Sequence, residues 1–175
     1  MVEENFDEET SPEIIADSSA QVKNQPDTTT QVEPPSSFDT GDKRQDLVDF
    51  AHQYIGTPYK FACSTPEEGF DCSGFLYYVF NKFGYTVPRS SKEYEFLGKE
   101  VPVNSAKRGD LVLFTPTEND TSGERIGHIG ILINEKGMNS DFIHASSGNA
   151  NGVTVSSLGS DHYTQRFVKV INIMD

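Results

Sequence analysis

Apolar residues recur at helical spacing soon after residue 42. The first set follows the i, i+3, i+4, i+7 pattern of an amphipathic helix: Leu47, Phe50, Ala51 and Tyr54. Gly56-Thr57-Pro58 is expected to end this helix. A second helix is predicted to begin near Cys72 and to end at Gly84. Its apolar residues occur on nearly every side, which indicates that it is buried.

Later segments add a short helix and then a series of strands. The four residues from Ser90 to Glu93 have the pattern of a capping box, which opens a short helix that ends near Gly98. Beyond residue 100, short apolar runs are separated by Gly, Asn and Ser turns: 111–114, 128–133, 141–145, 152–155 and 166–173. Helices followed by strands predict an α+β fold in which an antiparallel sheet packs on the helices.

Residues 1–41 differ from the rest of the chain in composition. They contain four prolines, and their ten acidic residues against one base, Lys23, give a charge of −9 out of the net −13. Such a segment has too few apolar residues to offset the entropy lost on ordering. We therefore expect a disordered acidic leader at 1–41 and one folded domain at 42–175. The leader either only solubilises the domain or also tethers it.

Composition and charge exclude several classes of protein. The chain has no apolar run of about 18 residues, so no membrane span is expected. It has no basic stripe, which argues against nucleic-acid binding. Two cysteines are too few for a disulfide framework. Nothing near Met1 resembles a signal peptide, so an exported protein would have a signal or lipid anchor that is absent from this chain.

Cys72 is the first candidate for chemistry, because it follows Asp71 and opens the buried helix. A helix N-terminus carries partial positive charge and unpaired N–H groups. These groups favour the reactive thiolate and can stabilise an oxyanion beside the sulfur. The alternative interpretation is a small buried cysteine without chemistry.

A nucleophilic cysteine needs a base, and His128 is the candidate. It shares one face of its predicted strand with Gly130, while isoleucines occupy the other face. If residues 134–140 close a symmetric hairpin, paired residue numbers add up to 274, so that Gly130 faces His144 and leaves room for two rings. The two histidines would then be diagonal neighbours roughly 7 Å apart. Each could instead be an ordinary core or surface histidine, and a β-bulge would break this register.

A metal site is the other interpretation of these residues. Cys63, Cys72 and the two histidines could nominally bind zinc, but zinc sites draw ligand pairs from tight spacings such as C-x-x-C, and none is present. No metal or other cofactor is therefore expected, and Cys63 is interpreted as a small side chain packed beside the cleft. The polar segment 115–125 either rims that cleft or is an ordinary surface loop.

Four ordered motifs resemble the NlpC-type bacterial cell-wall cysteine peptidases. They are Phe-Asp-Cys-Ser-Gly-Phe at 70–75, Gly-Asp-Leu-Val-Leu-Phe at 109–114, Gly-His-Ile-Gly-Ile at 127–131 and Phe-Ile-His-Ala-Ser at 142–146. The resemblance extends over about residues 45–172 and implies a papain-like α+β fold. It also implies hydrolysis of amide bonds in peptidoglycan stem peptides. The bond is usually γ-D-glutamyl–meso-diaminopimelate, and in some small relatives D-alanyl–diaminopimelate.

The resemblance also assigns roles by position. It implies that Cys72 is the nucleophile, that His128 is the base and that His144 is the third polar residue. Further positions are implied to line the site near the oxyanion or to bind substrate: Tyr59, Asp71, Ser73, Arg89, Ser90 and Ser91.

The sequence is therefore interpreted as a peptidoglycan endopeptidase that acts through a thioester. It is expected to be a monomer in the periplasm or cell envelope, with stem peptides as its partners. The alternatives are a papain-like amidase or acyltransferase that acts on another amide, and a catalytically silent wall-binding module.

Overall fold

The computed structural model describes residues 38–175, and the predicted leader before residue 38 lies outside the described residues. The helices are α1 (Lys43–His52), α2 (Cys72–Lys82) and α3 (Asp161–Arg166), with 3-10 helices η1 (Ser91–Phe96), η2 (Val103–Ser105) and η3 (Gly137–Asn139). The strands are β1 (Ser64–Thr65), β2 (Gly69–Phe70), β3 (Lys99–Val101), β4 (Leu111–Phe114), β5 (His128–Leu132), β6 (Asp141–Ser146), β7 (Gly152–Ser157) and β8 (Phe167–Asn172).

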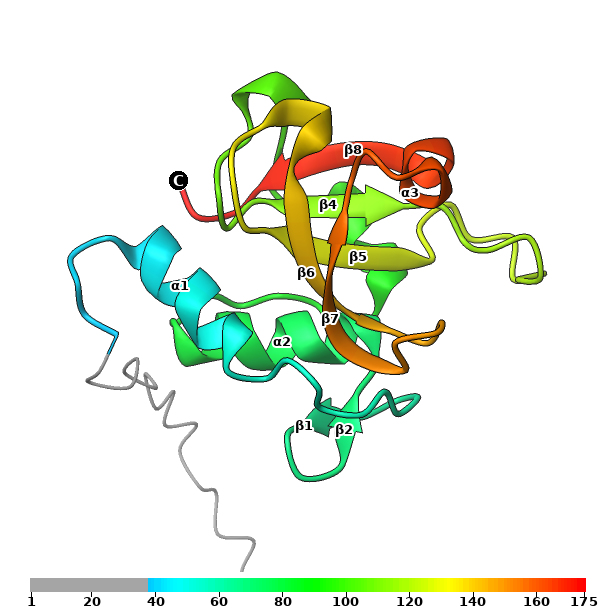
Figure 1. Ribbon diagram of the computed structural model, residues 1–175, viewed down its shortest axis with the longest axis horizontal. Helices are drawn as coiled ribbons and strands as arrows, with labels where there is room; N and C mark the ends of the chain where they lie inside the picture. Colours follow the sequence, from blue (N-terminus) through cyan, green and yellow to red (C-terminus); the bar gives the residue numbers. More distant parts are fainter. Residues whose placement is uncertain (1–37) are drawn as a thin grey trace, which may run out of the picture. The chain divides into compact units, whose positions relative to one another are not determined.

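The main sheet has six strands in the order β3-β8-β4-β5-β6-β7, and every neighbouring pair is antiparallel. Helix α2 contacts β5, β6 and α1, and Figure 1 shows α1 and α2 together on one side of the sheet. The α+β prediction is therefore confirmed. The β1–β2 hairpin forms a separate two-stranded sheet immediately before α2.

The two predicted long helices form where the pattern placed them. Helix α1 begins at Lys43 because the side chain of Asp42 accepts hydrogen bonds from two backbone N–H groups of its first turn. It ends at His52, so Tyr54 lies in the turn that follows rather than in the helix. Helix α2 ends at Lys82, two residues before Gly84, whose φ of 78° suits the left-handed conformation that closes a helix.

The last residues of the predicted leader contact α1. The ring of Phe38 packs edge-on against Phe50, with centroids 5.5 Å apart. The hydroxyl of Thr40 donates to the carboxylate of Asp46 at 2.7 Å. The residues that directly precede α1 therefore fold back and contact the side of the helix that is buried.

The predicted hairpin register is present between β5 and β6. Ile131 pairs with Ile143 and Leu132 pairs with Phe142, and both pairs of residue numbers add up to 274. The space beside Gly130 is filled by the Phe142 ring and not, as predicted, by the two histidine rings. A Cβ at Gly130 would lie 2.5 Å from the Phe142 ring, so the missing side chain accommodates Phe142 rather than two histidine rings.

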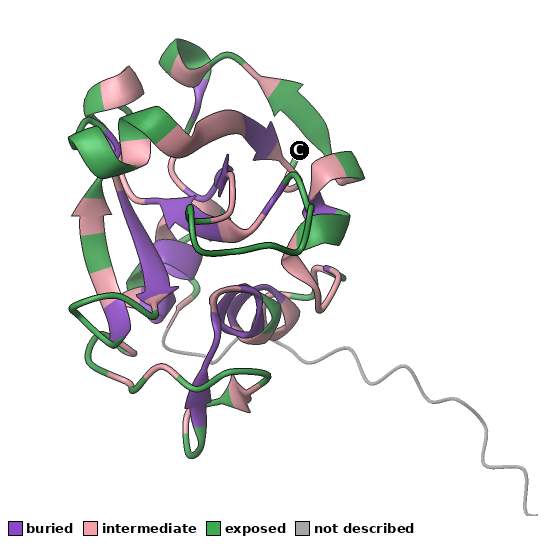
Figure 2. Cartoon of the chain, turned by 90° about the vertical axis from the view of Figure 1, so that its right-hand side faces the viewer, coloured by how far each residue is buried: buried purple, intermediate pink, exposed green. Residues whose placement is uncertain are grey.

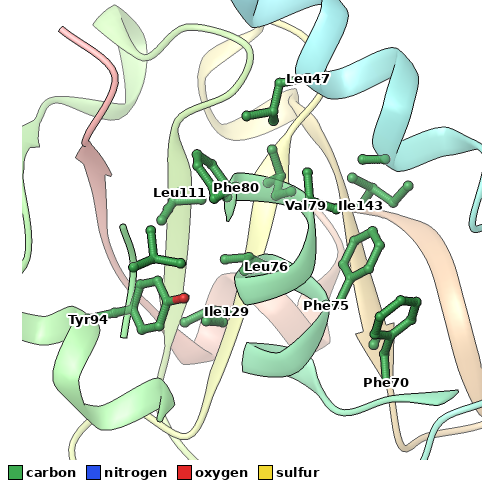
Figure 3. Packing of buried hydrophobic residues seen from close by; sticks show 14 of the residues in the cluster. Leu47, Phe70, Phe75, Leu76, Val79, Phe80, Tyr94, Leu111, Ile129 and Ile143 are labelled. Carbon is green, nitrogen blue, oxygen red and sulfur yellow. The ribbon is translucent and has the colours of Figure 1, made fainter. Parts of the chain in front are cut away.

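Apolar side chains pack on both faces of the sheet. The larger cluster lies between the helices and the sheet and includes the residues labelled in Figure 3: Leu47, Phe70, Phe75, Leu76, Val79, Phe80, Tyr94, Leu111, Ile129 and Ile143. A smaller cluster includes Phe114, Leu132 and Phe142, which alternate with the first set along the strands. Figure 2 shows the buried residues concentrated in α2 and in the central strands, with exposed loops around them.

Gly74 is the position where the start of α2 has no space for a side chain. A Cβ there would lie 2.1 Å from the Cys63 carbonyl oxygen and 2.9 Å from Asp71 Oδ1. Gly74→Ala must push α2 away from the loop that holds its first turn. We expect it to lower the free energy of unfolding by about 3 kcal/mol or more, at the upper end of overpacking effects.

Chemical denaturation of Gly74→Ala beside Gly148→Ala tests this expectation. The added Cβ at Gly148 would contact only Ser146 Oγ, at 3.3 Å, so this control is expected to stay close to the parent. Equal stability of the two variants would contradict the tight approach of α2 to Cys63.

Candidate active site

Cys72 is the first residue of α2 and lies at the wall of a cavity of about 430 Å³. The backbone N–H groups of Cys72, Ser73 and Ile129 act on its thiol and lower the thiol pKa. The first two belong to the helix N-terminus, as expected, and the third comes from the strand residue after His128. The sulfur therefore lies between α2 and the start of β5.

The protonation state of Cys72 differs from the expectation of a resting thiolate. Burial raises the pKa of the thiol to about 11, the negative charge of Asp71 acts in the same direction, and the backbone N–H groups oppose both. Desolvation disfavours the charged form of any acid, and here it outweighs the helix N-terminus. Near neutral pH Cys72 is therefore a thiol, and it needs a base in order to act as a nucleophile.

His128 and His144 form the pair that the register predicted. Nε2 of His128 lies 2.8 Å from Nδ1 of His144, and the ring planes meet at 82°. His144 is fully buried, and its Nε2 lies 2.9 Å from Ser156 Oγ and 3.4 Å from the hydroxyl of Tyr163. The second imidazole is thus held on both of its nitrogens.

This geometry assigns the ring protons. If His128 is to accept a proton at Nδ1, its Nε2–H must donate to His144 Nδ1. His144 then carries its own proton on Nε2 and donates it to Ser156 Oγ. In that arrangement His144 orients His128 and fixes its tautomer.

Both imidazoles are neutral near pH 7. Burial lowers the pKa of His128 well below 6.5, and His144, Arg166 and His162 act in the same direction. Burial also lowers the pKa of His144 to about 3. His128 lines the same cavity as the Cys72 thiol, and a neutral imidazole there can act as a general base.

The role of His144 predicts a graded response to substitution. His144→Gln offers an amide oxygen that can accept the His128 Nε2–H bond, so this variant should keep measurable activity. His144→Ala leaves that buried donor unpaired at a cost of about 1–3 kcal/mol, which corresponds to roughly 5- to 150-fold in rate. Steady-state kinetics of both variants, with thermal melts as a folding control, checks the order. A dead Gln variant beside an active Ala variant would contradict it.

Asp71 precedes α2 and stabilises its first turn, which carries Cys72. Its Oδ1 accepts from the Gly74 N–H at 2.6 Å and from Ser73 Oγ at 3.3 Å. Arg89 donates to both carboxylate oxygens, at 2.9 and 2.8 Å. Three of the groups that the resemblance assigned to substrate binding, Asp71, Ser73 and Arg89, are therefore hydrogen-bonded to one another. This network stabilises the helix that presents Cys72.

The remaining predicted positions divide between the cavity and its surroundings. Tyr59, Asp71, Ser73 and Ser91 line the cavity, whereas Arg89 and Ser90 are not part of the wall that the described residues form. Burial raises the pKa of the Tyr59 phenol to about 12, so that it stays protonated and can donate a hydrogen bond. Ser90 is the N-cap residue of η1, and its backbone N–H donates to the Glu93 carboxylate.

The segment 115–125 rims the cavity, which was one of its two interpretations. Thr117, Asp120, Ser122 and Glu124 contribute to the cavity wall. In Figure 1 this yellow-green loop extends beyond the ends of β4 and β5. Lys92 and Glu124 form an ion pair at 3.2 Å, which connects the loop to η1. The loop therefore forms one wall of the cleft.

Several residues of the site were not identified from the sequence. Ser156 and Tyr163 contact His144, and His162, Tyr163 and Arg166 line the cavity from α3. Ser156 could have been found by extending the hairpin arithmetic to β6 and β7, where Phe142 pairs with Ser156 and His144 with Thr154. Helix α3 has six residues and no buried apolar face, so it leaves no periodic signal.

Cys63 lies outside the cavity wall formed by residues 38–175. Its Sγ is 3.7 Å from a carboxylate oxygen of Glu68, and its backbone carbonyl accepts from Arg89. Over residues 38–175, no group of three or more His, Cys, Asp or Glu side chains is arranged to hold a metal ion.

Comparison with known proteins identifies relatives of this chain. A sequence model of the NlpC/P60 family matches residues 56–172. Gamma-DL-glutamyl hydrolase of Bacillus subtilis is 37% identical over 125 residues, which are 71% of this chain and 28% of that protein. Murein DD-endopeptidase MepS/murein LD-carboxypeptidase of Escherichia coli is 34% identical over 127 residues, 72% of this chain and 61% of that protein. The chain thus spans less than two thirds of either relative.

A solved structure shows the same fold. The crystal structure of an NLP/P60 family protein from Staphylococcus aureus, described as similar to lipoprotein, superposes with a TM-score of 0.64 and 26% identity. The match covers 83% of this chain and 45% of that chain. The papain-like α+β fold and the resemblance inferred from the motifs are both confirmed, and the chain belongs to the NlpC/P60 family.

Proposed function

We propose that this protein is a cysteine endopeptidase that hydrolyses amide bonds in peptidoglycan stem peptides. The observation that carries the proposal is the 2.8 Å contact between His128 Nε2 and His144 Nδ1 in a cavity that Cys72 also lines. It leaves Nδ1 of His128 as the free base for the thiol. The relatives act on γ-DL-glutamyl bonds and on murein, which gives the substrate class.

The proposed reaction begins with the neutral thiol and imidazole. His128 Nδ1 takes the proton of Cys72 as Sγ attacks the amide carbonyl carbon. The oxyanion receives hydrogen bonds from backbone N–H groups at the start of α2 and from the Tyr59 hydroxyl. The C–N bond then breaks, and the imidazolium gives its proton to the leaving amine.

The second half of the reaction regenerates the enzyme. The acyl group is now a thioester on Cys72, and the amine product leaves. His128 removes a proton from water as the water oxygen attacks the thioester carbon. The C–S bond breaks, the sulfur regains a proton from His128, and the carboxylic acid product departs.

Two bonds of the stem peptide fit this proposal. One is γ-D-glutamyl–meso-diaminopimelate, which resembles the bond in the name of the Bacillus subtilis relative. The other is D-alanyl–diaminopimelate, which fits the DD-endopeptidase name of the Escherichia coli relative. Both bonds are amides with a free carboxylate nearby. The same catalytic residues could therefore hydrolyse either bond.

Digestion of purified muropeptides in H₂¹⁸O, followed by mass spectrometry, tests the function. We expect two products, with one ¹⁸O atom in the new carboxyl group and the product masses identifying the bond. Products joined to an added amine instead of ¹⁸O would indicate an acyltransferase. Binding of muropeptides without cleavage would indicate a silent wall-binding module, and either result would overturn the proposal.

The proposal also implies a location. Peptidoglycan lies outside the cytoplasmic membrane, so the protein must be exported, and we propose that it acts as a monomer in the periplasm or cell envelope. In residues 38–175, no helix has the length and apolar character needed to cross a membrane. Detection of the protein only in the cytoplasmic fraction of its native host would contradict this location.

A further inference from the structure

Arg166 is a half-buried arginine at the end of α3, and it lines the active-site cavity. Other basic groups near the cleft have carboxylate partners: Lys92 pairs with Glu124 at 3.2 Å, and Arg89 pairs with Asp71 at 2.8 Å. Within residues 38–175, no carboxylate lies within 4.0 Å of the Arg166 guanidinium. Among the described residues, the Arg166 guanidinium therefore lines the cavity without an ion-pair partner.

The guanidinium of Arg166 is held in place by partners that are not carboxylates. Nε and Nη2 donate to the Thr115 carbonyl at 3.1 and 2.7 Å, and Nη1 donates to His162 Nε2 at 2.8 Å. A guanidinium has five N–H donors, and these bonds use three of them. Two N–H groups remain, which is the number that a carboxylate accepts in a bidentate pair.

Arg166 lies at the same edge of the sheet as His128, where β4 ends and where β5 and β8 begin. Arg166 directly precedes Phe167, which pairs with Phe114, and Phe114 pairs with His128. The backbone at Arg166 is therefore about two strand spacings, or roughly 10 Å, from that of His128. The side chain of Arg166 lines the same cavity as His128.

The charge of Arg166 acts on the catalytic residues. It contributes to the lowered pKa of His128 and of His144, after burial. Burial lowers the pKa of Arg166 itself, because the charged form is partly removed from water. An arginine kept charged in a cavity without a counter-ion is costly unless a ligand supplies the counter-ion.

We propose that Arg166, supported by His162 and Thr115, binds a free carboxylate of the substrate and so selects stem peptides by charge. The inference rests on the proposed function and adds the chemistry of one subsite to it. A γ-linked glutamyl residue keeps a free α-carboxylate, and diaminopimelate carries carboxylates of its own. Either group can supply the anion, because both lie within a few bonds of the amide to be cleaved.

The test pairs an enzyme variant with an altered substrate. Three muropeptides are compared: one with all carboxylates free, one amidated at the glutamyl α-carboxyl and one amidated at diaminopimelate. Parent, Arg166→Gln and Arg125→Gln are assayed for kcat and KM on each. Arg125→Gln is the matched control, because it removes the same charge from an arginine that pairs with Glu95 at 2.7 Å and is not among the described residues that line the cavity.

We expect the parent to lose about 10- to 100-fold in kcat/KM on one amidated muropeptide, mainly through KM. Arg166→Gln should lose a similar factor on the free substrate and should no longer distinguish it from that amidated form. Arg125→Gln should behave as the parent. The amidated muropeptide on which the parent loses kcat/KM identifies the carboxylate that Arg166 binds.

Two outcomes would overturn the subsite. One is a parent that does not distinguish any of the three muropeptides. The other is an Arg166→Gln variant that is slowed equally on all three, with a shifted pH profile, since that result would mean that Arg166 acts only on His128. If the parent cleaves none of them, calorimetric binding of the same muropeptides to Cys72→Ala and to Cys72→Ala/Arg166→Gln still decides the matter. An equal preference for the free carboxylate in both variants would overturn the subsite independently of catalysis.

Discussion

Cys72→Ala is expected to lower kcat/KM on muropeptides by at least about 10⁴-fold, as the loss of a covalent nucleophile does in other hydrolases. Without the sulfur no thioester can form, and water must attack the amide directly. The backbone N–H groups at the start of α2 and the base His128 remain in place. The residual rate then measures what they contribute without covalent chemistry.

Cys63→Ser is the matched control for this substitution. Cys63 lies outside the cavity wall formed by the described residues, and its backbone carbonyl, rather than its sulfur, bonds to Arg89 and to the Asp71 N–H. We expect this variant to keep the activity of the parent. An inactive Cys63→Ser beside an active Cys72→Ala would exchange the roles of the two thiols.

His128→Asn is expected to lower kcat by at least about 100-fold, within the range of general acid–base catalysis. Because burial raises the pKa of the Cys72 thiol to about 11, the nucleophile depends on a base at neutral pH. Asparagine can occupy a similar volume and can form hydrogen bonds, but it cannot take up a proton. Both the attack by sulfur and the protonation of the leaving amine therefore become slow.

A pH series distinguishes this loss from a folding defect. In His128→Asn the rate should rise at alkaline pH, where Cys72 ionises without a base, while the melting temperature stays near that of the parent. The rate of the parent should not depend on alkaline pH in this way, because His128 is present as the base. A His128→Asn variant with near-parental kcat at pH 7 would contradict the assignment of His128 as the base.

The sequence predicted the parts of the fold that depend on local pattern. The start of α2 at Cys72 and the bounds of β4 agree with the structure, because a capping residue and a short apolar run between turn residues are signals that act over a few positions. The relation of His128 to His144 was also predictable, since one hairpin register determines it. The short strands β1, β2 and β3 have two or three residues each, too few for any periodicity to be visible.

The electrostatics of the site could not be predicted in the same way. The helix N-terminus at Cys72 was visible in the sequence, but the burial that raises the thiol pKa depends on the packing of α2 against β5. Likewise, the pairing of Asp71 with Arg89 joins residues 18 positions apart. Local pattern describes one element at a time, whereas pKa values and ion pairs depend on which elements meet.

The most direct test of the account is detection of the thioester on Cys72. The enzyme is mixed with excess muropeptide and quenched in acid, and the peptide that contains Cys72 is weighed by mass spectrometry. A second series includes hydroxylamine, which intercepts a thioester as a hydroxamate. The account predicts an acyl adduct on Cys72, or a hydroxamate product that increases with hydroxylamine only when enzyme is present. Steady turnover with an unmodified Cys72 and only the free acid as product at every hydroxylamine concentration would contradict it.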